Sequence, residues 1–285
     1  MIRTPVHPKP VLVVGSSGKT GSRVATRLRA RGVPVRDGSR QASPPFDWEN
    51  PATWGPPLEG TGAVYLTYAP DLAVPGAIAA IETFTRLARA AGVQGVVLLS
   101  GRGEPEAQAA EQILQESGIP WTILRCAWFM QNFSEGYLRE PVLEGAVMLP
   151  AGDIGEPFID ADDIADVAVA ALTEAGHAER LYELTGPRLL TFADATAGIA
   201  AATRRPVAYQ TISMAEYLPA LTEAGAPPDV VWLIEYLFST VLDGRNASLA
   251  NGVQDALGRP PRDFTAYAQA AAASGVWNAA VGAAR

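Results

Sequence analysis

A glycine-rich turn near the start of the chain constrains the fold more than any other feature. The segment VLVVGSSGKTGSRVATRL, residues 11–28, carries four apolar residues, a turn, and then apolar residues at helical spacing. The glycines of the turn follow the spacing Gly15-x-x-Gly18-x-x-Gly21. Such glycines permit a tight turn, the approach of a backbone to a pyrophosphate, and close packing of the helix on the strand. We therefore expect a dinucleotide-binding turn rather than a turn without a ligand, with phosphates facing the N–H groups at the start of the helix. The side chains in the turn that can add further donors are Ser17, Lys19 and Thr20.

Short apolar runs alternate with helical patterns through the first half of the chain. The expected strands are residues 11–14, 33–36, 63–67, 96–100 and 121–125, and the expected helices are 18–31, 75–91 and 105–117. Gly32, Gly92 and Gly118 each follow a helix and precede a strand, where a left-handed C-cap glycine belongs. Strands and helices that alternate in this way predict an α/β fold with a doubly wound parallel sheet.

The pattern changes after Pro150. Expected helices at residues 159–173, 192–203, 214–224 and 228–242 surround one short expected strand at 181–184. We therefore expect a Rossmann-like nucleotide-binding domain at residues 1–150. Residues 151–285 are expected to form a smaller, mostly helical substrate lobe, with some chain returning to the sheet.

The end of the second expected strand, in VPVRDGSR, bears on the choice of cofactor. A site for NAD usually carries an acidic residue here, which binds the ribose 2′-hydroxyl. Arg40 can instead pair with a 2′-phosphate and stack on adenine, which favours NADPH over NADH. The alternative is that Arg40 is a solvated arginine and Asp37 is the ribose ligand. In the following segment FDWENPATW, Asp47 is a candidate acceptor for the adenine amino group, although the aromatic residues around it are also typical of a core.

Composition excludes several classes of protein. The net charge of −8 argues against a nucleic-acid partner, which would need a basic surface. Cys126 is the only cysteine, and the only histidines are His7 and His177, so neither a disulfide nor a zinc site is expected. The chain shows no signal peptide and no apolar run of membrane-spanning length, so we expect a cytoplasmic protein. The sequence does not distinguish a monomer from a homodimer.

Several loose motifs occur together and in order along the chain. They are GSSGKTG, FDW, LLS at residues 98–100, ILRCAWFMQNF at 123–133, PFIDADDIADVA at 157–168 and GRPPRDFTAYA at 258–268. As an ordered set they resemble the NmrA-like group of atypical short-chain dehydrogenases. Within that group the chain is similar to the branch of the ergot-alkaloid iminium reductases and their bacterial relatives, nearly from end to end.

The resemblance implies a role for particular residues. The pyrophosphate would be held by Gly15, Ser17, Gly18, Lys19, Thr20 and Gly21, and the adenosine phosphate by Arg40. Residues expected to line the cofactor at the ends of two strands are Thr67, Tyr68, Ala69 and Ser100. Residues expected near the nicotinamide and the substrate are Tyr68, Trp128, Phe129, Asn132, Phe133 and Phe158. The family usually has Arg-Pro where this chain has Arg125-Cys126. We expect Cys126 to be a small buried apolar residue.

Ordinary short-chain dehydrogenases protonate their substrate with the tyrosine of a Tyr-x-x-x-Lys pair. The only lysines here are Lys9 and Lys19, and neither has a tyrosine four residues before it. If Glu111 matches a glutamate that extended relatives carry beyond that lysine, Ala107 takes the lysine position and Gly103 the tyrosine position. The substrate must then be cationic already, such as an iminium, or another group must protonate it. The candidates for this group are Tyr68, Tyr137, Glu104, Glu111, Asp160 and a water molecule, and we assign Ser100, Glu111 and Tyr137 to the catalytic site.

The carboxylates and Tyr137 also have simpler interpretations. Glu104 and Glu111 are typical of solvated helix charges, Asp160 of a helix cap, and Tyr137 of packing within the second lobe. The sequence favours an NADPH-dependent reductase of a C=N bond or an activated C=C or C=O bond of a small molecule, in secondary metabolism. One alternative is a regulator that senses NAD(P) without catalysis, and another is a cyclase or isomerase without redox chemistry.

Overall fold

The computed structural model describes residues 9–278, so His7 lies outside the described residues. The chain forms two compact units. The first contains the described residues up to Cys126 together with Ala161–Leu184 and Ala250–Pro260. The second contains Ala127–Asp160, Thr185–Leu249 and the chain from Pro261 onward. This division differs from a single boundary at residue 150, because the chain leaves the first unit and returns to it twice.

A six-stranded parallel sheet forms the centre of the first unit, in the order β2-β1-β3-β4-β5-β7. The strands are β1 Val11–Val14, β2 Val35–Gly38, β3 Ala63–Leu66, β4 Val96–Gly101, β5 Trp121–Cys126 and β7 Arg180–Leu184. Both β1 and β3 are buried at every position, as expected for strands with helices on both faces. The expected Rossmann-like fold is confirmed. The strand order reverses between β1 and β3, where open α/β sheets bind their ligands.

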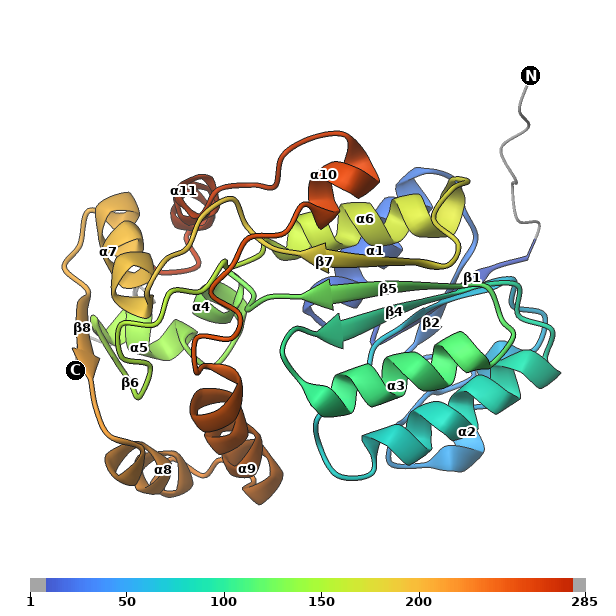
Figure 1. The fold of residues 1–285 in the computed structure, drawn as a ribbon, viewed down its shortest axis with the longest axis horizontal. Helices are drawn as coiled ribbons and strands as arrows, with labels where there is room; N and C mark the ends of the chain where they lie inside the picture. Colours follow the sequence, from blue (N-terminus) through green and yellow to red (C-terminus); the bar gives the residue numbers. More distant parts are fainter. Residues whose placement is uncertain (1–8, 279–285) are drawn as a thin grey trace. The chain divides into compact units, whose positions relative to one another are not determined.

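Helices cover the two faces of this sheet (Figure 1). Helices α1 Lys19–Ala30 and α6 Ala161–Thr173 pack together on one face, and the short α10 Gly252–Leu257 contacts α6 and β7. On the other face, α2 Ala77–Ala90 packs beside α3 Pro105–Glu116. The three glycines expected to follow helices have φ of 71°, 72° and 77°, which confirms the left-handed conformation predicted for them.

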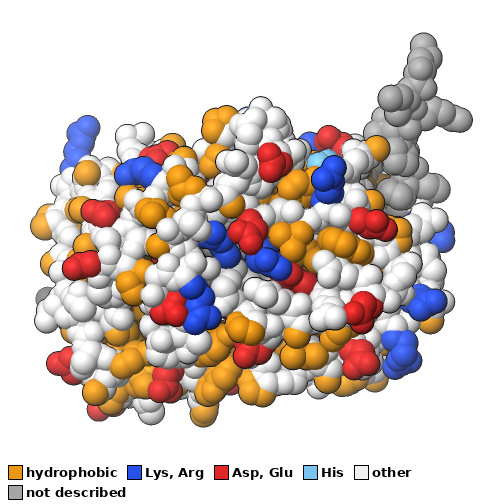
Figure 2. All heavy atoms as spheres, in the orientation of Figure 1, with side chains coloured by type: hydrophobic (Ala, Val, Ile, Leu, Met, Phe, Trp, Pro, Cys, Tyr) orange, Lys and Arg blue, Asp and Glu red, His pale blue; other side chains and the backbone are white. Residues whose placement is uncertain are grey.

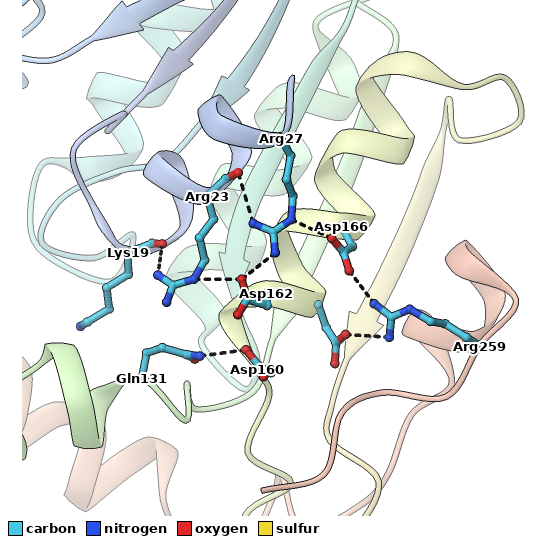
Figure 3. A network of polar contacts seen from close by, with 9 residues as sticks. Lys19, Arg23, Arg27, Gln131, Asp160, Asp162, Asp166 and Arg259 are labelled. Atoms are coloured by element: carbon cyan, nitrogen blue, oxygen red, sulfur yellow. Dashed lines mark hydrogen bonds and ion pairs between the residues drawn. The ribbon is translucent and has the colours of Figure 1, made fainter. Parts of the chain in front are cut away.

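Arginines of α1 and of the segment after α10 meet the acidic first half of α6 (Figure 3). Arg27 of α1 pairs with Asp162 at 2.6 Å and with Asp166 at 2.8 Å. From the other side, Arg259 pairs with Asp166 at 2.6 Å and with the fully buried Asp163 at 2.8 Å. These ion pairs join three segments that are far apart in the sequence.

The second unit combines helices with a two-stranded parallel sheet of β6 Ala146–Leu149 and β8 Ala208–Thr211. Its helices are α4 Asn132–Glu135, α5 Arg139–Glu144, α7 Phe192–Thr203, α8 Met214–Glu223, α9 Pro228–Tyr236 and α11 Phe264–Ser274. Helices α7 and α8 begin with complete capping boxes, at Thr191 and Ser213. The helix expected over residues 228–242 ends at Tyr236 and continues as a π-helical turn, Leu237–Val241.

The surface carries both signs of charge. On the face drawn in Figure 2, acidic and basic side chains are interspersed among hydrophobic and uncharged ones, whereas a nucleic-acid-binding face would gather Lys and Arg. Over residues 9–278, no helix has both the length and the apolar character needed to cross a membrane. Within that same span, no three His, Cys, Asp or Glu side chains are grouped so that they could hold a metal ion.

Candidate functional site

The glycine turn brings the end of β1 and the start of α1 into very close contact. Gly15 has a φ of 73°, and its N–H donates to the carbonyl of Gly38 at 2.8 Å. The N–H of Gly18 in turn donates to the carbonyl of Gly15 at 2.8 Å. A Cβ atom at position 21 would lie 2.1 Å from that same carbonyl oxygen, so only glycine allows α1 to approach β1 this closely. The structure thus brings the three glycines together at one tight turn, and their contact with a pyrophosphate stays a prediction.

The start of α1 is suited to an anion. Gly18 is the N-cap and supplies no side-chain hydrogen bond, and the first turn of the helix contains no acidic residue. The first N–H groups of a helix have no partner within the helix and carry the positive end of its dipole. Ser17 is exposed and Lys19 is half-buried, so their side chains remain candidates to bind phosphate. Thr20 is only 5% exposed, which leaves its backbone N–H as its contribution to the site.

Thr67 joins the end of β3 to the glycine turn. Its Oγ1 donates to the carbonyl of Val14 at 3.1 Å and lies where a Cβ at Gly15 would approach within 2.4 Å. The indole N–H of Trp48 donates to the carbonyl of Thr67 at 3.0 Å, and its ring packs on Tyr68 with 4.8 Å between centroids. Tyr68 is half-buried and Ala69 exposed, next to the turn at the same sheet edge. Trp48 is a positioning residue that the FDW motif gave no reason to single out.

The two candidates for the ribose site differ in whether they already have an ion-pair partner. Asp37 on β2 pairs with Arg29 of α1 at 2.6 Å. Arg40, just beyond the end of β2, is exposed and has no ion pair or hydrogen bond with any residue from 9 to 278. A guanidinium that is already free loses no internal partner when it binds a phosphate. The geometry therefore favours Arg40 over Asp37.

The FDW segment forms hydrogen bonds within its own loop and packs aromatic side chains into the core of the first unit. The Asp47 carbonyl accepts from the indole N–H of Trp54 at 2.7 Å, and its carboxylate accepts from the N–H of Glu49 at 3.1 Å. Phe46 and Trp54 are buried in the core of the first unit, as the simpler interpretation of this loop expected. The adenine contact assigned to Asp47 stays a prediction, and the structure shows this residue shaping its own loop.

Ser100 and Glu111 are joined in a buried polar network at the end of β4. Ser100 Oγ donates to Glu111 Oε1 at 2.6 Å, and Glu111 also forms a bidentate ion pair with Arg125 of β5. Arg125 reaches Glu183 of β7 at 3.2 Å, and the contact with Glu111 raises the pKa of the guanidinium above its usual range. Both oxygens of Glu111 are thus bound to donors. This arrangement favours a structural role for Glu111.

The residues expected at the substrate lie in the second unit, apart from Tyr68. The segment containing Trp128 is tied to the segment containing Phe158, because the N–H of Met130 donates to the carbonyl of Ile159 and the N–H of Ile159 to that of Trp128, both at 2.9 Å. Phe133 and Phe158 are buried in an aromatic core, 5.8 Å apart between centroids. Their burial favours a role in packing, and substrate contact for them stays a prediction. The half-buried residues that remain substrate candidates are Trp128, Phe129 and Asn132.

The remaining candidates are placed as follows. Tyr137 lies between α4 and α5 and is 38% exposed, so a catalytic role for it stays a prediction. Asp160 is buried and accepts a hydrogen bond from the Gln131 side chain at 2.8 Å (Figure 3). Cys126 is 5% exposed, and burial raises the pKa of its thiol well above the usual range. This agrees with the interpretation of Cys126 as a small buried apolar residue.

Comparison with known proteins gives matches over most of the chain. A family model described as NAD(P)H-binding matches residues 15–175, more than half of the sequence. Festuclavine synthase II from Penicillium roqueforti is 33% identical, over 91% of this chain and 97% of that protein. An NAD(P)H azoreductase from Xenophilus azovorans is 31% identical, over 93% of this chain and 98% of that protein. Among solved structures, the triphenylmethane reductase of Citrobacter sp. in complex with NADP(H) has a TM-score of 0.72 at 20% identity, over 92% of this chain and 99% of that one.

The fold and the glycine turn define a dinucleotide-binding protein of the Rossmann class. The chain belongs to the NAD(P)H-binding family, and its ordered motifs resemble those of the NmrA-like atypical short-chain dehydrogenases. It is an NAD(P)H-dependent oxidoreductase.

Proposed function

We propose that this protein is an NADPH-dependent reductase that acts on a C=N bond, or on an activated C=C or C=O bond, of a small organic molecule in secondary metabolism. The observation that carries this proposal is an intact glycine turn beside a free Arg40, in a chain without a Tyr-x-x-x-Lys pair. The turn supports dinucleotide binding, and the missing pair supports an electrophile that differs from a simple ketone.

The preference for NADPH rests on charge. Arg40 has no internal partner among residues 9–278, whereas Asp37 is already paired with Arg29. An NADH-specific site would need Asp37 free to accept from the ribose, and it would gain nothing from Arg40. The Citrobacter structure that shares this fold contains NADP(H), which supports the same choice.

The names of the relatives support the class of substrate. One is named an azoreductase and the other a festuclavine synthase, which favours a nitrogen-containing electrophile of small or medium size. The half-buried Trp128 and Phe129 can offer an aromatic face to such a molecule, and a π-face stabilises a cationic carbon–nitrogen double bond.

The chain's own residues would bind and orient the reactants. The N–H groups at the start of α1 bind the pyrophosphate, and Arg40 binds the 2′-phosphate. Thr67 and Trp48 fix the end of β3 against the turn. Bound NADPH supplies a hydride, and an iminium substrate then needs nothing further because the hydride neutralises its charge.

A titration tests the cofactor site first. The fluorescence of NADPH and of NADH is followed as each is titrated with wild-type protein, Arg40→Ala and the control Arg89→Ala, an exposed arginine on α2. We expect Arg40→Ala to weaken NADPH binding by roughly 10- to 100-fold, since a charge-assisted pair contributes about 1.5–3 kcal/mol. Binding of NADH should change little, and Arg89→Ala should match the wild type. Equal loss for both cofactors, or a preference of the wild type for NADH, contradicts the proposal.

Turnover is then measured by the loss of NADPH absorbance with a permanently charged cyclic iminium, an azo dye, a quinone and an enone. Reduction of any of them supports the reductase. Tight NADPH binding with no reduction of any probe would favour a regulator that senses the cofactor, and absence of binding would favour chemistry without redox.

A further inference from the structure

Two buried carboxyl groups meet at the edge of the sheet where β3 and β4 end. Asp71 lies in the loop that follows β3, and Glu104 is the N-cap residue of α3, just after β4. β3 and β4 are parallel neighbours, so their carboxyl ends lie at the same edge as the glycine turn. The side chains of Asp71 and Glu104 interact, and each acts on the pKa of the other.

Two buried carboxyl groups that act on each other repel when both are ionised, so this placement favours a proton on one of them. No Lys or Arg among residues 9–278 forms an ion pair with either carboxyl group. Asp71 Oδ1 accepts from the N–H of Ala73 at 2.8 Å. Glu104 is 6% exposed and does not cap α3, and its Oε2 has no hydrogen-bond partner in the described part of the chain.

The space for the Glu104 carboxyl group is provided by Gly101. A Cβ atom at position 101 would lie 2.2 Å from both Glu104 oxygens, so any other residue would displace the group. The side chain is therefore folded back over the end of β4, although an exposed N-cap residue could point into solvent. The fold thus provides a dedicated space for a buried carboxyl group that keeps one oxygen without a hydrogen-bond partner.

The surroundings of Glu104 hold the proton in place. The titratable groups that act on it are the acids Asp71, Glu106 and Glu111, and Glu104 in turn acts on the pKa of the Cys126 thiol. Arg125, on the neighbouring strand β5, is bound to Glu111. Burial, followed by repulsion from Asp71, raises the pKa of Glu104 to about 10, and burial also raises the pKa of Asp71. Two such groups titrate as a unit, and both shifts favour one proton on the pair at neutral pH.

We propose that the Asp71–Glu104 pair is the proton donor of this reductase, in the place of the tyrosine that the chain lacks. The proposal rests on the proposed function and extends it to substrates that need a proton as well as a hydride. The O–H bond of Glu104 breaks, and the proton forms a new bond to the oxygen, nitrogen or carbon atom that gains negative charge. With the hydride from NADPH the substrate gains two electrons and two hydrogens, and the pair is left with two negative charges. Asp71 is half-buried, so water can return a proton to the pair through it.

The first experiment observes the proton without any turnover. Infrared spectra of the protein without cofactor, recorded in H₂O and D₂O across neutral pH, report protonated carboxylic acids through their C=O stretch. We expect a band from a buried acid in the wild type that is absent in Glu104→Gln and shifted in Asp71→Asn. Glu116→Gln, an exposed change on the same helix, should keep the band. Absence of the band at neutral pH in the wild type overturns the proposal.

The second experiment separates hydride transfer from proton transfer. N-methyl dihydroisoquinolinium needs only a hydride, whereas menadione needs a hydride and a proton. We expect Glu104→Gln to lower kcat for menadione by roughly 100-fold, the usual scale of acid catalysis, and to leave the iminium within about threefold of the wild type. Gly101→Ala displaces the carboxyl group without altering its chemistry. Like Glu104→Gln, it should lower kcat for menadione and change kcat for the iminium little.

The outcomes distinguish this proposal from the proposed function. Equal losses on both substrates, or no loss on menadione, contradict the donor role while the reductase stands. No turnover of either probe by the wild type contradicts the proposed function, and with it the donor role, whatever the infrared band shows. NADPH titration of each variant shows whether its site is still folded. Glu104→Asp, which keeps the acid, should recover part of the menadione activity that Glu104→Gln loses.

Discussion

At the scale of single residues, this site depends on glycines, whose lack of a Cβ atom allows close contacts. Gly15, Gly21 and Gly38 each leave room for a backbone or hydroxyl group at a distance that a Cβ atom would occupy. The sequence spacing predicted the first two because such turns need them wherever a helix starts close to a strand. Gly38 has a φ outside the left-handed region and gave no such signal. Its role comes from the neighbouring β1 backbone, 2.9 Å from where its Cβ would be.

Glu104 also makes a prediction for stability that does not involve catalysis. Its pKa is 4.5 in a model peptide and about 10 in the folded protein, so between these values the folded state binds one more proton than the unfolded state. Stability must then fall as pH rises through this window, by at most about 1.4 kcal/mol per pH unit. Burial also raises the pKa of Asp71.

We expect Glu104→Gln to remove most of this slope, because the amide keeps a donor for Asp71 and has no proton to lose. The free energy of unfolding is measured by urea denaturation at about pH 6 and about pH 9 at constant ionic strength. The wild type should lose stability over that interval. The loss in Glu104→Gln should be smaller than in the wild type by at least about 1 kcal/mol. Glu116→Gln should keep the wild-type slope. A slope unchanged in Glu104→Gln would show that the acid is ionised throughout.

At the scale of elements, the sequence predicted periodic segments well and pairings poorly. Residues 11–14 and 192–203 form the expected strand and helix without any shift of their ends. The strand expected at 33–36 is found at Val35–Gly38, because its register is set by pairing with β1 up to Val14 opposite Gly38. The strands β6 and β8 have four residues each and pair across about 60 residues of sequence, so no local pattern marks them.

The site shows the same limit. The glycine spacing and the position of Arg40 are local features of a short segment, so they could be predicted from the sequence. The contact between Asp71 and Glu104 depends on two loops whose ends meet only because β3 and β4 are neighbours. The burial of Phe133 and Phe158 likewise depends on how the second unit packs, and a pattern of aromatic residues is typical of a pocket and of a core alike.

The segment after α10 makes a prediction at this scale. Arg259 is the cation opposite the fully buried Asp163, and it also pairs with Asp166. Arg259→Ala removes that partner from a buried carboxylate. We expect a cost of about 2 kcal/mol, below the usual value for a broken buried pair because Arg259 is partly exposed, and a fall in Tm of roughly 5 °C. Differential scanning calorimetry measures this change.

Arg31→Ala is the matched control, because the Arg31–Glu174 pair also joins α1 to the end of α6 but is about half exposed on both sides. It should lower Tm by no more than about 2 °C. A similar small change for both variants would mean that Asp163 is not dependent on Arg259.

At the scale of the whole molecule, the second unit is inserted into the first twice. The chain leaves the first unit after Cys126 and returns at Ala161, then leaves after Leu184 and returns at Ala250. The first exit and return lie close together, since the N–H of Ile159 donates to the carbonyl of Trp128 at 2.9 Å. The second pair is also close, because a Cβ at Gly252 would lie 2.3 Å from the carbonyl oxygen of Glu183. Short links can therefore replace both insertions without straining the sheet.

This arrangement predicts which parts of the chain fold alone. A chain ending at residue 150 lacks α6, β7 and α10, so α1 loses the helix it packs on and β5 becomes an exposed edge. We expect such a chain to show no cooperative thermal transition and no NADPH binding. A chain of residues 1–126, 161–184 and 250–260, joined by two Gly-Ser linkers of about six residues, keeps all six strands and the Arg259 contacts.

That joined chain should unfold cooperatively in circular dichroism, bind NADPH within roughly tenfold of the full-length affinity, and reduce none of the probe substrates. The loss of turnover follows because Trp128 and Phe129 are absent, whereas the glycine turn, Arg40 and the Asp71–Glu104 pair are all retained. Its infrared spectrum should therefore still contain the buried acid band at neutral pH. If the chain ending at residue 150 folds and binds NADPH while the joined chain does not, the nucleotide-binding unit is continuous in sequence and the double insertion is not what holds it together.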